Sequence, residues 1–318
     1  MRTLSRAALL AAALAVAGVG TSGCNKLNFF RGQMAFKDAN AAYGANDYKK
    51  AIDKYQEALG YNPKLSVAYF YLANSYDNLY KPAKKGQPEN DANLQKAVDY
   101  YKKASETIAE PKLKKLSFQY LVACYGSDKL NDPSQAEPLV EKMIQMDPSD
   151  PANYYALTKI YEDAGNYEQA EATLLKAKEA RPSDGSVYMQ LASYYNRQGK
   201  FDKTMEALNQ RAAVDPKDPA GFYTIAVYYW DKTFRDKSLK DADRRDYIAK
   251  GLEAADKALA IKPDYLEAIV YKGLLIRNQA AMEKDRKKYQ ELMDEANALT
   301  NRAKALQKSK TTGTGATK

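Results

Sequence analysis

The sequence predicts an all-α fold in which a short pair of helices repeats along the chain. The chain has 318 residues but only 16 Gly and 12 Pro, a combined share below the ordinary ~12%. Both residues damage helix interiors, so their scarcity favours long helices. The other two observations are a 34-residue repeat and, inside each repeat, apolar residues spaced as on one face of a helix.

The repeat is clearest in the middle of the chain. One segment carries, in order, Tyr154, Leu157, Thr158, Tyr161, Gly165, Tyr167, Ala170, Leu174, Ala177 and Pro182. After 34 residues the chain reads Tyr188, Leu191, Ala192, Tyr195, Gly199, Phe201, Thr204, Leu208, Arg211 and Pro216. The first four positions of each series are spaced i, i+3, i+4 and i+7, which indicates a helix. The glycine then ends that helix, and a second amphipathic helix runs to the proline.

These two segments resemble the tetratricopeptide repeat (TPR) family at successive positions of its pattern. Partial matches precede and follow them, for example at Ala39, Tyr48, Ala51, Tyr55, Leu72, Ala73, Tyr76, Leu121, Tyr125, Ala226 and Tyr229. The resemblance covers residues 32–306. It implies a right-handed α-solenoid of about six to seven helix-turn-helix units with a C-terminal capping helix.

Two stretches are longer than the repeat requires. Residues 79–93 contain Pro82, Gly86 and Pro88, which predict a loop. Residues 231–246 lack Gly and Pro and alternate in charge, so they predict a solvated helical extension. Both insertions are candidate contacts for a partner, and both are equally compatible with plain surface segments. After the solenoid, residues 307–318 are expected to form a disordered basic tail.

The start of the chain has the pattern of a secretory signal. Arg2 and Arg6 precede an uncharged run over residues 7–20, which is shorter than the ~20 residues of a membrane span. Small residues then lead to Cys24, and this arrangement resembles the bacterial lipobox, although Thr21 stands where that motif usually has Leu. We expect residues 1–23 to be a lipoprotein signal peptide. The alternative is an ordinary signal peptide and an unanchored, secreted protein.

The resemblance to bacterial lipoproteins implies that Cys24 carries lipid. Asn25 stands where an Asp would tend to retain the protein at the inner membrane, so the periplasmic face of the outer membrane is the expected location. Residues 24–31 are expected to be a short tether. If Cys24 is lipidated, Cys124 is the remaining cysteine, and its apolar neighbours predict a buried, inert thiol.

Composition excludes several classes of function. The chain has no His and only 2 Cys, which removes His-based catalysis and the usual zinc sites, so no catalytic residue, metal or cofactor is expected. The formal charge is +9, but the ends hold seven of the surplus cations and the rest of the chain is close to neutral. That distribution argues against a nucleic-acid partner.

The TPR resemblance also implies where a partner would bind. In that family the first helix of each unit lines a concave groove, where aromatic and amide side chains suit a peptide. The matching positions here are Phe36, Asn40, Tyr43, Phe70, Asn74, Asp77, Tyr155, Lys159, Met189, Asn196, Tyr223 and Trp230.

The sequence thus predicts a membrane-anchored, non-enzymatic scaffold that binds a peptide or partner protein in the cell envelope. Among lipoproteins with this plan, the pilotins that assist secretin assembly in type IV pili are similar in repeat number. A periplasmic protein that binds a small ligand or acts as an enzyme is the other alternative. The partner, the process and the oligomeric state are not determined by the sequence.

Overall fold

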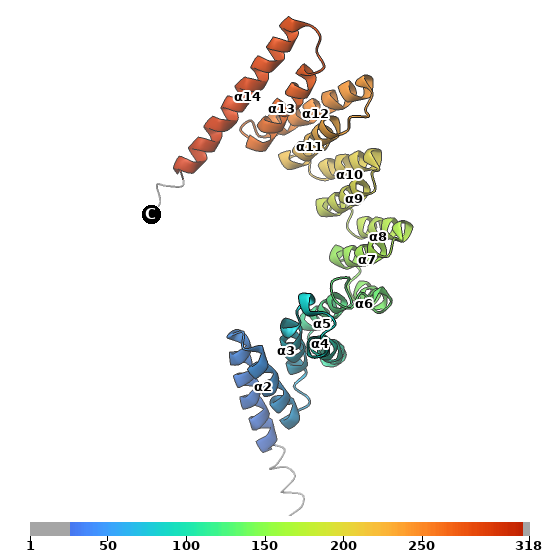
Figure 1. Ribbon diagram of the computed structural model, residues 1–318, viewed down its shortest axis with the longest axis vertical. Helices are drawn as coiled ribbons and strands as arrows, with labels where there is room; N and C mark the ends of the chain where they lie inside the picture. Colours follow the sequence, from blue (N-terminus) through green and yellow to red (C-terminus); the bar gives the residue numbers. More distant parts are fainter. Residues whose placement is uncertain (1–25, 314–318) are drawn as a thin grey trace, which may run out of the picture. The chain divides into compact units, whose positions relative to one another are not determined.

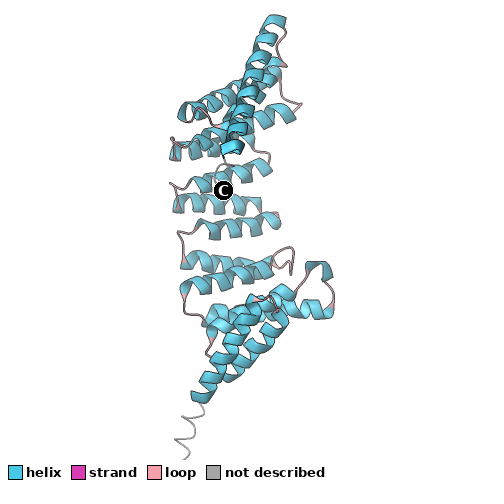
Figure 2. Cartoon of the chain, turned by 90° about the vertical axis from the view of Figure 1, so that its left-hand side faces the viewer, coloured by secondary structure: helices cyan, strands magenta, loops and turns pink. Residues whose placement is uncertain are grey.

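The computed structural model describes residues 26–313, with side chains up to residue 309. Within that range the chain forms only helices, turns and loops (Figure 2). None of the described helices is both long enough and apolar enough to cross a membrane. Cys24, Asn25 and the expected signal peptide lie outside the described residues.

The helices follow one another in pairs joined by short turns (Figure 1). A helix over residues 26–44 precedes α2 Tyr48–Tyr61, α3 Ser66–Leu79, α4 Pro88–Thr107, α5 Pro111–Cys124, α6 Pro133–Met146 and α7 Pro151–Asp163. The remaining helices are α8 Tyr167–Ala180, α9 Gly185–Arg197, α10 Phe201–Val214, α11 Pro219–Arg235, α12 Asp241–Ile261, α13 Leu266–Ala280 and α14 Arg286–Gly313.

The chain divides into two compact units. The first contains the residues up to Pro148 together with Ala156–Tyr167, and the second contains Ser149–Tyr155 and the residues from Glu168 onward. In the first unit α2 to α6 each pack against the next helix of the chain, and in the second α9 to α14 do the same. Helices α11 and α13, the first members of adjacent pairs, also touch. This packing of neighbouring helical hairpins confirms the predicted α-solenoid class of fold.

Helices approach one another closely where small residues face each other. Alanines with no exposed surface recur at the repeat positions, among them Ala51, Ala58, Ala73, Ala97, Ala104, Ala170, Ala177, Ala192 and Ala258. Large side chains fill the spaces between these contacts, and Tyr55, Tyr101 and Tyr194 are among the largest that are fully buried. The predicted turns are also confirmed, because Gly165 and Gly199 adopt φ of +76° and +68° between the two helices of their units.

The repeat extends to a hydrogen bond between adjacent hairpins. The hydroxyl of Tyr161 donates to Glu137 at 2.7 Å, and 34 residues later the hydroxyl of Tyr195 donates to Glu171 at 3.1 Å. In each case the tyrosine ends a first helix and the acid belongs to the second helix of the preceding unit. Burial and the neighbouring carboxylate raise the pKa of Tyr161 to about 12, so the phenol stays protonated and remains a donor.

The two insertions lengthen second helices. The loop after α3 covers residues 80–87 and includes the 3₁₀ turn Pro82–Lys84, but α4 already begins at Pro88. Residues 88–93 are therefore helical and not part of the predicted loop, since proline suits the first helical position and acids follow it. The second insertion is helical as predicted, apart from a break over residues 236–240 between α11 and α12.

Both ends of the described chain are more helical than the sequence indicated. Helix α14 continues to Gly313, so residues 307–313 are helical and do not belong to a disordered tail. At the other end, residues 26–31 belong to the first helix, which shortens the expected tether over 24–31. Neither segment has a residue that stops a helix, which is why the helices run on past the family's pattern.

Two helical glycines test the closeness of this packing. A Cβ on Gly251 in α12 would lie 2.9 Å from Leu275 of α13 and 3.1 Å from Tyr229 of α11, whereas a Cβ on Gly60 in α2 would meet nothing within 4 Å. We expect Gly251→Ala to lower the free energy of unfolding by about 1 kcal/mol through overpacking. Gly60→Ala should raise it by about 0.5–1 kcal/mol, because alanine is the better helix former. Urea denaturation followed by circular dichroism measures both, and equal stabilisation by the two variants would contradict a close contact at Gly251.

Candidate functional site

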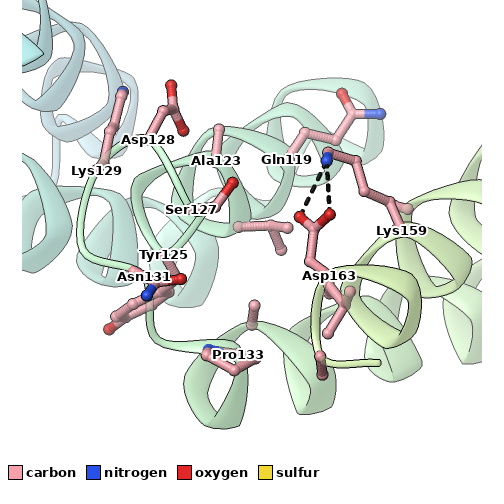
Figure 3. A pocket seen from close by; sticks show the side chains of 16 residues that line it. Gln119, Ala123, Tyr125, Ser127, Asp128, Lys129, Asn131, Pro133, Lys159 and Asp163 are labelled. Atoms are coloured by element: carbon pink, nitrogen blue, oxygen red, sulfur yellow. Dashed lines mark hydrogen bonds and ion pairs between the residues drawn. The ribbon is translucent and has the colours of Figure 1, made fainter. Parts of the chain in front are cut away.

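The first unit contains an open cavity of about 370 Å³ between α5 and α7 (Figure 3). Its walls come from three helices and one loop of that unit. The lining residues are Gln119, Val122 and Ala123 of α5, Tyr125, Gly126, Ser127, Asp128, Lys129 and Asn131 of the loop, Pro133 and Ala136 of α6, and Ala156, Lys159, Ile160, Asp163 and Ala164 in and after α7.

The cavity owes its shape to the loop between α5 and α6. Eight residues, 125–132, connect these helices, whereas three residues, 164–166, connect α7 to α8. The loop folds back on itself through three backbone bonds, from Leu130 N to Cys124 O at 3.2 Å, from Asn131 N to Gly126 O at 2.9 Å and from Asp132 N to Tyr125 O at 2.9 Å. Asn131 takes a left-handed φ of +55°, which asparagine tolerates better than most residues.

An ion pair fastens this loop to α3. The Lys129 ammonium donates to the Asp77 carboxylate at 2.5 Å, and the two side chains are only 16% and 10% exposed. Burial alone would lower the pKa of Lys129, but the hydrogen bond to Asp77 and the nearby negative charges, including those of Asp77 and Asp128, together outweigh it, and the pKa lies above its ordinary value. The loop is further held by the Lys85 ammonium, which donates to the Lys129 carbonyl at 2.6 Å. Asp77, predicted as a groove residue, does not line the cavity itself. It holds the loop that does, through its ion pair with Lys129.

The cavity combines apolar walls with a charged rim. Val122, Ala123 and Ile160 supply apolar surface, and the Lys159 ammonium lies 2.9 Å from the Asp163 carboxylate (Figure 3). That pair is well exposed, with side-chain exposures of 70% and 43%, so the attraction between the two charges is weak and the pair is easily broken. An apolar side chain of a peptide fits such a site, and a charged neighbour of that side chain can replace one member of the pair.

Three predicted groove residues of the first helix pair lie together. The Phe36 ring is 5.8 Å from that of Tyr55, whose hydroxyl donates to Asn40 at 2.7 Å. The Tyr43 hydroxyl donates to Asn74 at 2.7 Å. Phe36 and Tyr43 are half-buried, and Asn40 is exposed. Their polar groups bond within the protein.

Phe70 and Asn74 of α3 are placed in the interior. Their exposed fractions are 4% and 5%. The Phe70 ring packs against Tyr101 and Tyr120, and the Asn74 amide donates to the Tyr101 hydroxyl at 3.0 Å. Burial also raises the pKa of Tyr101. Neither Phe70 nor Asn74 presents a surface to a partner, so a change at either residue would act through packing.

Three predicted residues of the repeat's clearest segment differ in exposure. Asn196 on α9 is exposed, Met189 on the same helix is half-buried, and Tyr155 on α7 is half-buried. Burial raises the pKa of Tyr155. Lys159 is the one predicted residue that lines the cavity.

The last two predicted residues belong to an aromatic cluster of the second unit. The Trp230 ring stacks on Phe234 at 5.2 Å and meets the Tyr271 ring edge-on at 5.2 Å. Tyr223 contacts Tyr271 and Tyr265 at 5.6 and 5.5 Å. The cluster links α11 to α13. Its members are each half-buried, so part of its surface stays open to solvent: Tyr223, Trp230, Tyr265 and Tyr271.

Sequence reasoning missed the other residues of the cavity, although one signal was present. Eleven positions separate Tyr125 from Ala136, whereas nine separate the equivalent Tyr161 from Ala170. Two extra residues in a turn of fixed length predict a larger loop, and a larger loop leaves space beside the next hairpin. The family's groove positions carry no information about such an insertion.

The described residues offer little for metal or thiol chemistry. No group of three or more His, Cys, Asp or Glu in this part of the chain is arranged to hold a metal ion. The Cys124 thiol, behind the cavity, has no exposed surface, and burial raises its pKa to about 12. The predicted burial of this thiol is thus confirmed, and its low reactivity stays a prediction.

Comparisons with known proteins agree on the type of fold. Residues 129–192 match the tetratricopeptide repeat family. The C-terminal part of a TPR repeat-containing protein from Cytophaga hutchinsonii is 16% identical, with 83% of this chain and 95% of that chain covered and a TM-score of 0.53. A TPR protein from Parabacteroides merdae is 14% identical (84% and 98% covered, TM-score 0.44), and MamA is 21% identical (57% and 92% covered, TM-score 0.40). A search of curated proteins finds no match.

The ion pair behind the cavity predicts the reactivity of Cys124. In a Cys24→Ser background, Lys129→Met should speed native-state labelling of Cys124 by a thiol reagent about tenfold, because an unpaired Asp77 carboxylate loosens the loop. Lys159→Met is the matched control, since its exposed pair adds little stability and labelling should not change. Mass spectrometry of the labelled protein gives the rates. Equal rates for both variants would show that Lys129 does not hold the loop.

Proposed function

We propose that this protein is a membrane-anchored, non-enzymatic scaffold that holds a peptide segment of a partner protein in the cavity between α5 and α7. The observation that carries the proposal is the cavity itself, a hollow of about 370 Å³ with apolar walls and one loosely held ion pair at its rim. Cavities that accept side chains or small ligands start at about this size.

The surroundings of the cavity favour a peptide over a small ligand. The cavity is open and lies between α5 and α7, the first helices of two adjacent hairpins, so a main chain can pass across it while one side chain enters. Its floor is fixed in advance by the loop over residues 125–132 and the ion pair of Lys129 with Asp77. A site that is formed before binding loses little conformational entropy when a peptide docks.

Several observations support a role without catalysis. Lys159 and Asp163 neutralise each other at the rim, and the thiol of Cys124 is sealed behind the wall. In the part of the chain that the structure describes, no metal-binding cluster accompanies them. Binding, not bond making, is the activity for which this arrangement is suited.

The cellular place in this proposal comes from the sequence. The signal pattern of residues 1–23 and the position of Cys24 support a lipid anchor in a bacterial envelope, and Asn25 supports the periplasmic face of the outer membrane. A pilotin-like role in secretin assembly is one process compatible with this place. No feature of the cavity favours it over other assembly tasks.

Site-specific crosslinking tests the cavity. A photo-crosslinking residue at Ala123, which is exposed on α5 and lines the cavity, should capture one partner protein in cells. Ala123→Trp on an otherwise native chain should abolish association with that partner, because the indole fills the hollow. Ala123 is a better test position than Phe70, whose truncation would leave a void in the core.

Gln145 provides the matched control for both experiments. It is exposed on α6 of the same unit but does not line the cavity. A crosslinker at Gln145 should not capture the partner, and Gln145→Trp should leave association unchanged. If the two positions captured the same proteins, or if Ala123→Trp had no effect, the cavity would not be the binding site.

Lipidation is tested directly at Cys24. Cells grown with labelled palmitate should attach the label to the wild-type protein and not to Cys24→Ser, because the thiol is the acceptor. Gel fluorography of the purified protein gives the result, with Cys124→Ala as the control that keeps its label. A labelled Cys24→Ser protein, or an unlabelled wild type, would contradict the anchor.

A further inference from the structure

The first helix, over residues 26–44, has apolar residues on two faces. The face that packs against α2 consists mainly of small residues. Ala35, Ala39 and Ala42 are at most 6% exposed, and Gly32 is buried as well. A Cβ on Gly32 would lie 3.1 Å from Asn62, so this side approaches the end of α2 closely. Phe36 also contacts α2 through Tyr55, whereas the other large apolar residues of the segment are exposed.

Three of those large residues form an exposed stripe. Leu27, Phe30 and Met34 are 50%, 64% and 68% exposed, and their i, i+3, i+7 spacing places them on one side of the helix. We name these three residues the outer stripe. Phe29 is 49% exposed and contacts the stripe, because its ring meets the Phe30 ring edge-on with 5.9 Å between the ring centroids.

This distribution is the reverse of an ordinary surface helix. Such a helix turns its bulky apolar side chains to the core and its polar ones to water. Here the side that faces α2 has mainly alanine and glycine, with Phe36 as its one large apolar residue, and Leu27, Phe30 and Met34 are exposed. Contiguous apolar surface of this kind marks a place where another surface docks.

The charges beside the stripe indicate which surface that is. Lys26, Arg31 and Lys37 lie among residues 26–37, and no acid occurs in that range. The Arg31 guanidinium sits 5.9 Å from the Tyr61 ring centroid, so it stays at the side of the stripe. Asp38, the residue after Lys37, is exposed one turn after Met34, so the flanks of the stripe carry three cations and one acid. An apolar stripe with a surplus of basic residues beside it is complementary to the acyl and phosphate layers of a phospholipid surface.

The position of the stripe along the chain agrees with this surface. Cys24, the residue with the lipobox pattern, is two positions before Lys26, where the described helix begins. At about 1.5 Å rise per residue, the whole stripe lies within roughly 12 Å of Lys26 along the helix axis. Acyl chains at Cys24 and the side chains of the stripe can therefore enter the same leaflet.

We propose that the outer stripe is a membrane-docking surface that lies on an anionic phospholipid bilayer, with Lys26, Arg31 and Lys37 contacting headgroup phosphates. It rests on the proposed placement at a membrane, but it requires no acyl chain, so it can be tested on the unlipidated protein. Its role is to fix the orientation of the first hairpin on the membrane, which acyl chains at a single residue would not do.

Vesicle binding tests the stripe. The protein used is the chain from residue 24 onward with Cys24→Ser, which keeps every described residue and cannot be acylated there. Co-sedimentation with vesicles of phosphatidylethanolamine and phosphatidylglycerol measures its partition coefficient, and phosphatidylcholine vesicles give the uncharged reference. We expect binding to the anionic vesicles that weakens with salt, because the basic flank contributes to it.

Two sets of variants separate the apolar and charged parts. Leu27→Ser, Phe30→Ser and Met34→Ser together should lower the partition coefficient at least about tenfold on both lipids. Lys26→Gln and Arg31→Gln together should lower it about tenfold on anionic vesicles and hardly at all on phosphatidylcholine. The matched control is Met146→Ser, Leu175→Ser and Val270→Ser, three exposed apolar residues on α6, α8 and α13, which should leave binding unchanged.

A depth measurement identifies the contact itself. Trp230 is the chain's only tryptophan, so Phe30→Trp in a Trp230→Phe background reports from the stripe alone. Its fluorescence should shift to the blue with anionic vesicles and be quenched by brominated acyl chains. Circular dichroism melts of all variants check that the fold is retained.

Three outcomes would overturn the proposal. One is wild-type protein that stays in the supernatant with anionic vesicles, and another is a stripe variant that binds as tightly as wild type. The third is stripe-dependent dimerisation without lipid in sedimentation experiments, which would make this face a contact between copies of the chain. None of these changes palmitate labelling of Cys24, so failure of the stripe and failure of the anchor are distinguishable.

Discussion

The close approach of helices at small residues is the constraint on which the rest of this structure depends. No hairpin of some thirty residues buries enough apolar surface to be stable alone, so each must rest on its neighbour. Alanines without exposed surface, such as Ala97 and Ala177, bring the helix axes together. Tyrosine and leucine then fill the spaces at the sides of these contacts. The same rule explains Gly251, where even one methyl group would meet Leu275.

Tyrosine solves a second problem of a stacked fold. A seam between hairpins runs from the core to the surface, so a residue there needs an apolar body and a polar end. Tyr161 and Tyr195 meet this need by bonding to glutamates of the preceding unit, and Tyr101 does so by accepting from Asn74. Because these rings are engaged in packing, the binding surface that we propose lies where the packing is interrupted, at the cavity beside the loop over residues 125–132.

The difference between sequence and structure follows from the same physics. The 34-residue period predicts the hairpins and their turns, since each position of the pattern has one packing role. The exposure of a groove residue is not set by its own position but by what the next hairpin places over it. Tyr101 and Tyr120 cover Phe70, and Lys129 engages Asp77, and both contacts depend on residues far along the chain. Asn40 and Asn196 have no such cover and are exposed, as their positions alone suggest.

Loops and ends show the same dependence in another form. The two extra residues before Ala136 have little meaning in a repeat alignment, yet they create the space that the cavity occupies. Among the described residues, the first helix contacts α2 and α3, and its bulky residues Leu27, Phe30 and Met34 lie away from these contacts. A terminal hairpin is the one place in such a stack where an apolar face is not covered by the next repeat.

If a bilayer covers that face, the first unit is fixed at the membrane. The cavity belongs to the same unit, so it would then be held at a fixed distance from the docked helix. A partner bound there would be presented at a defined height above the lipid, which a flexible tether would not achieve.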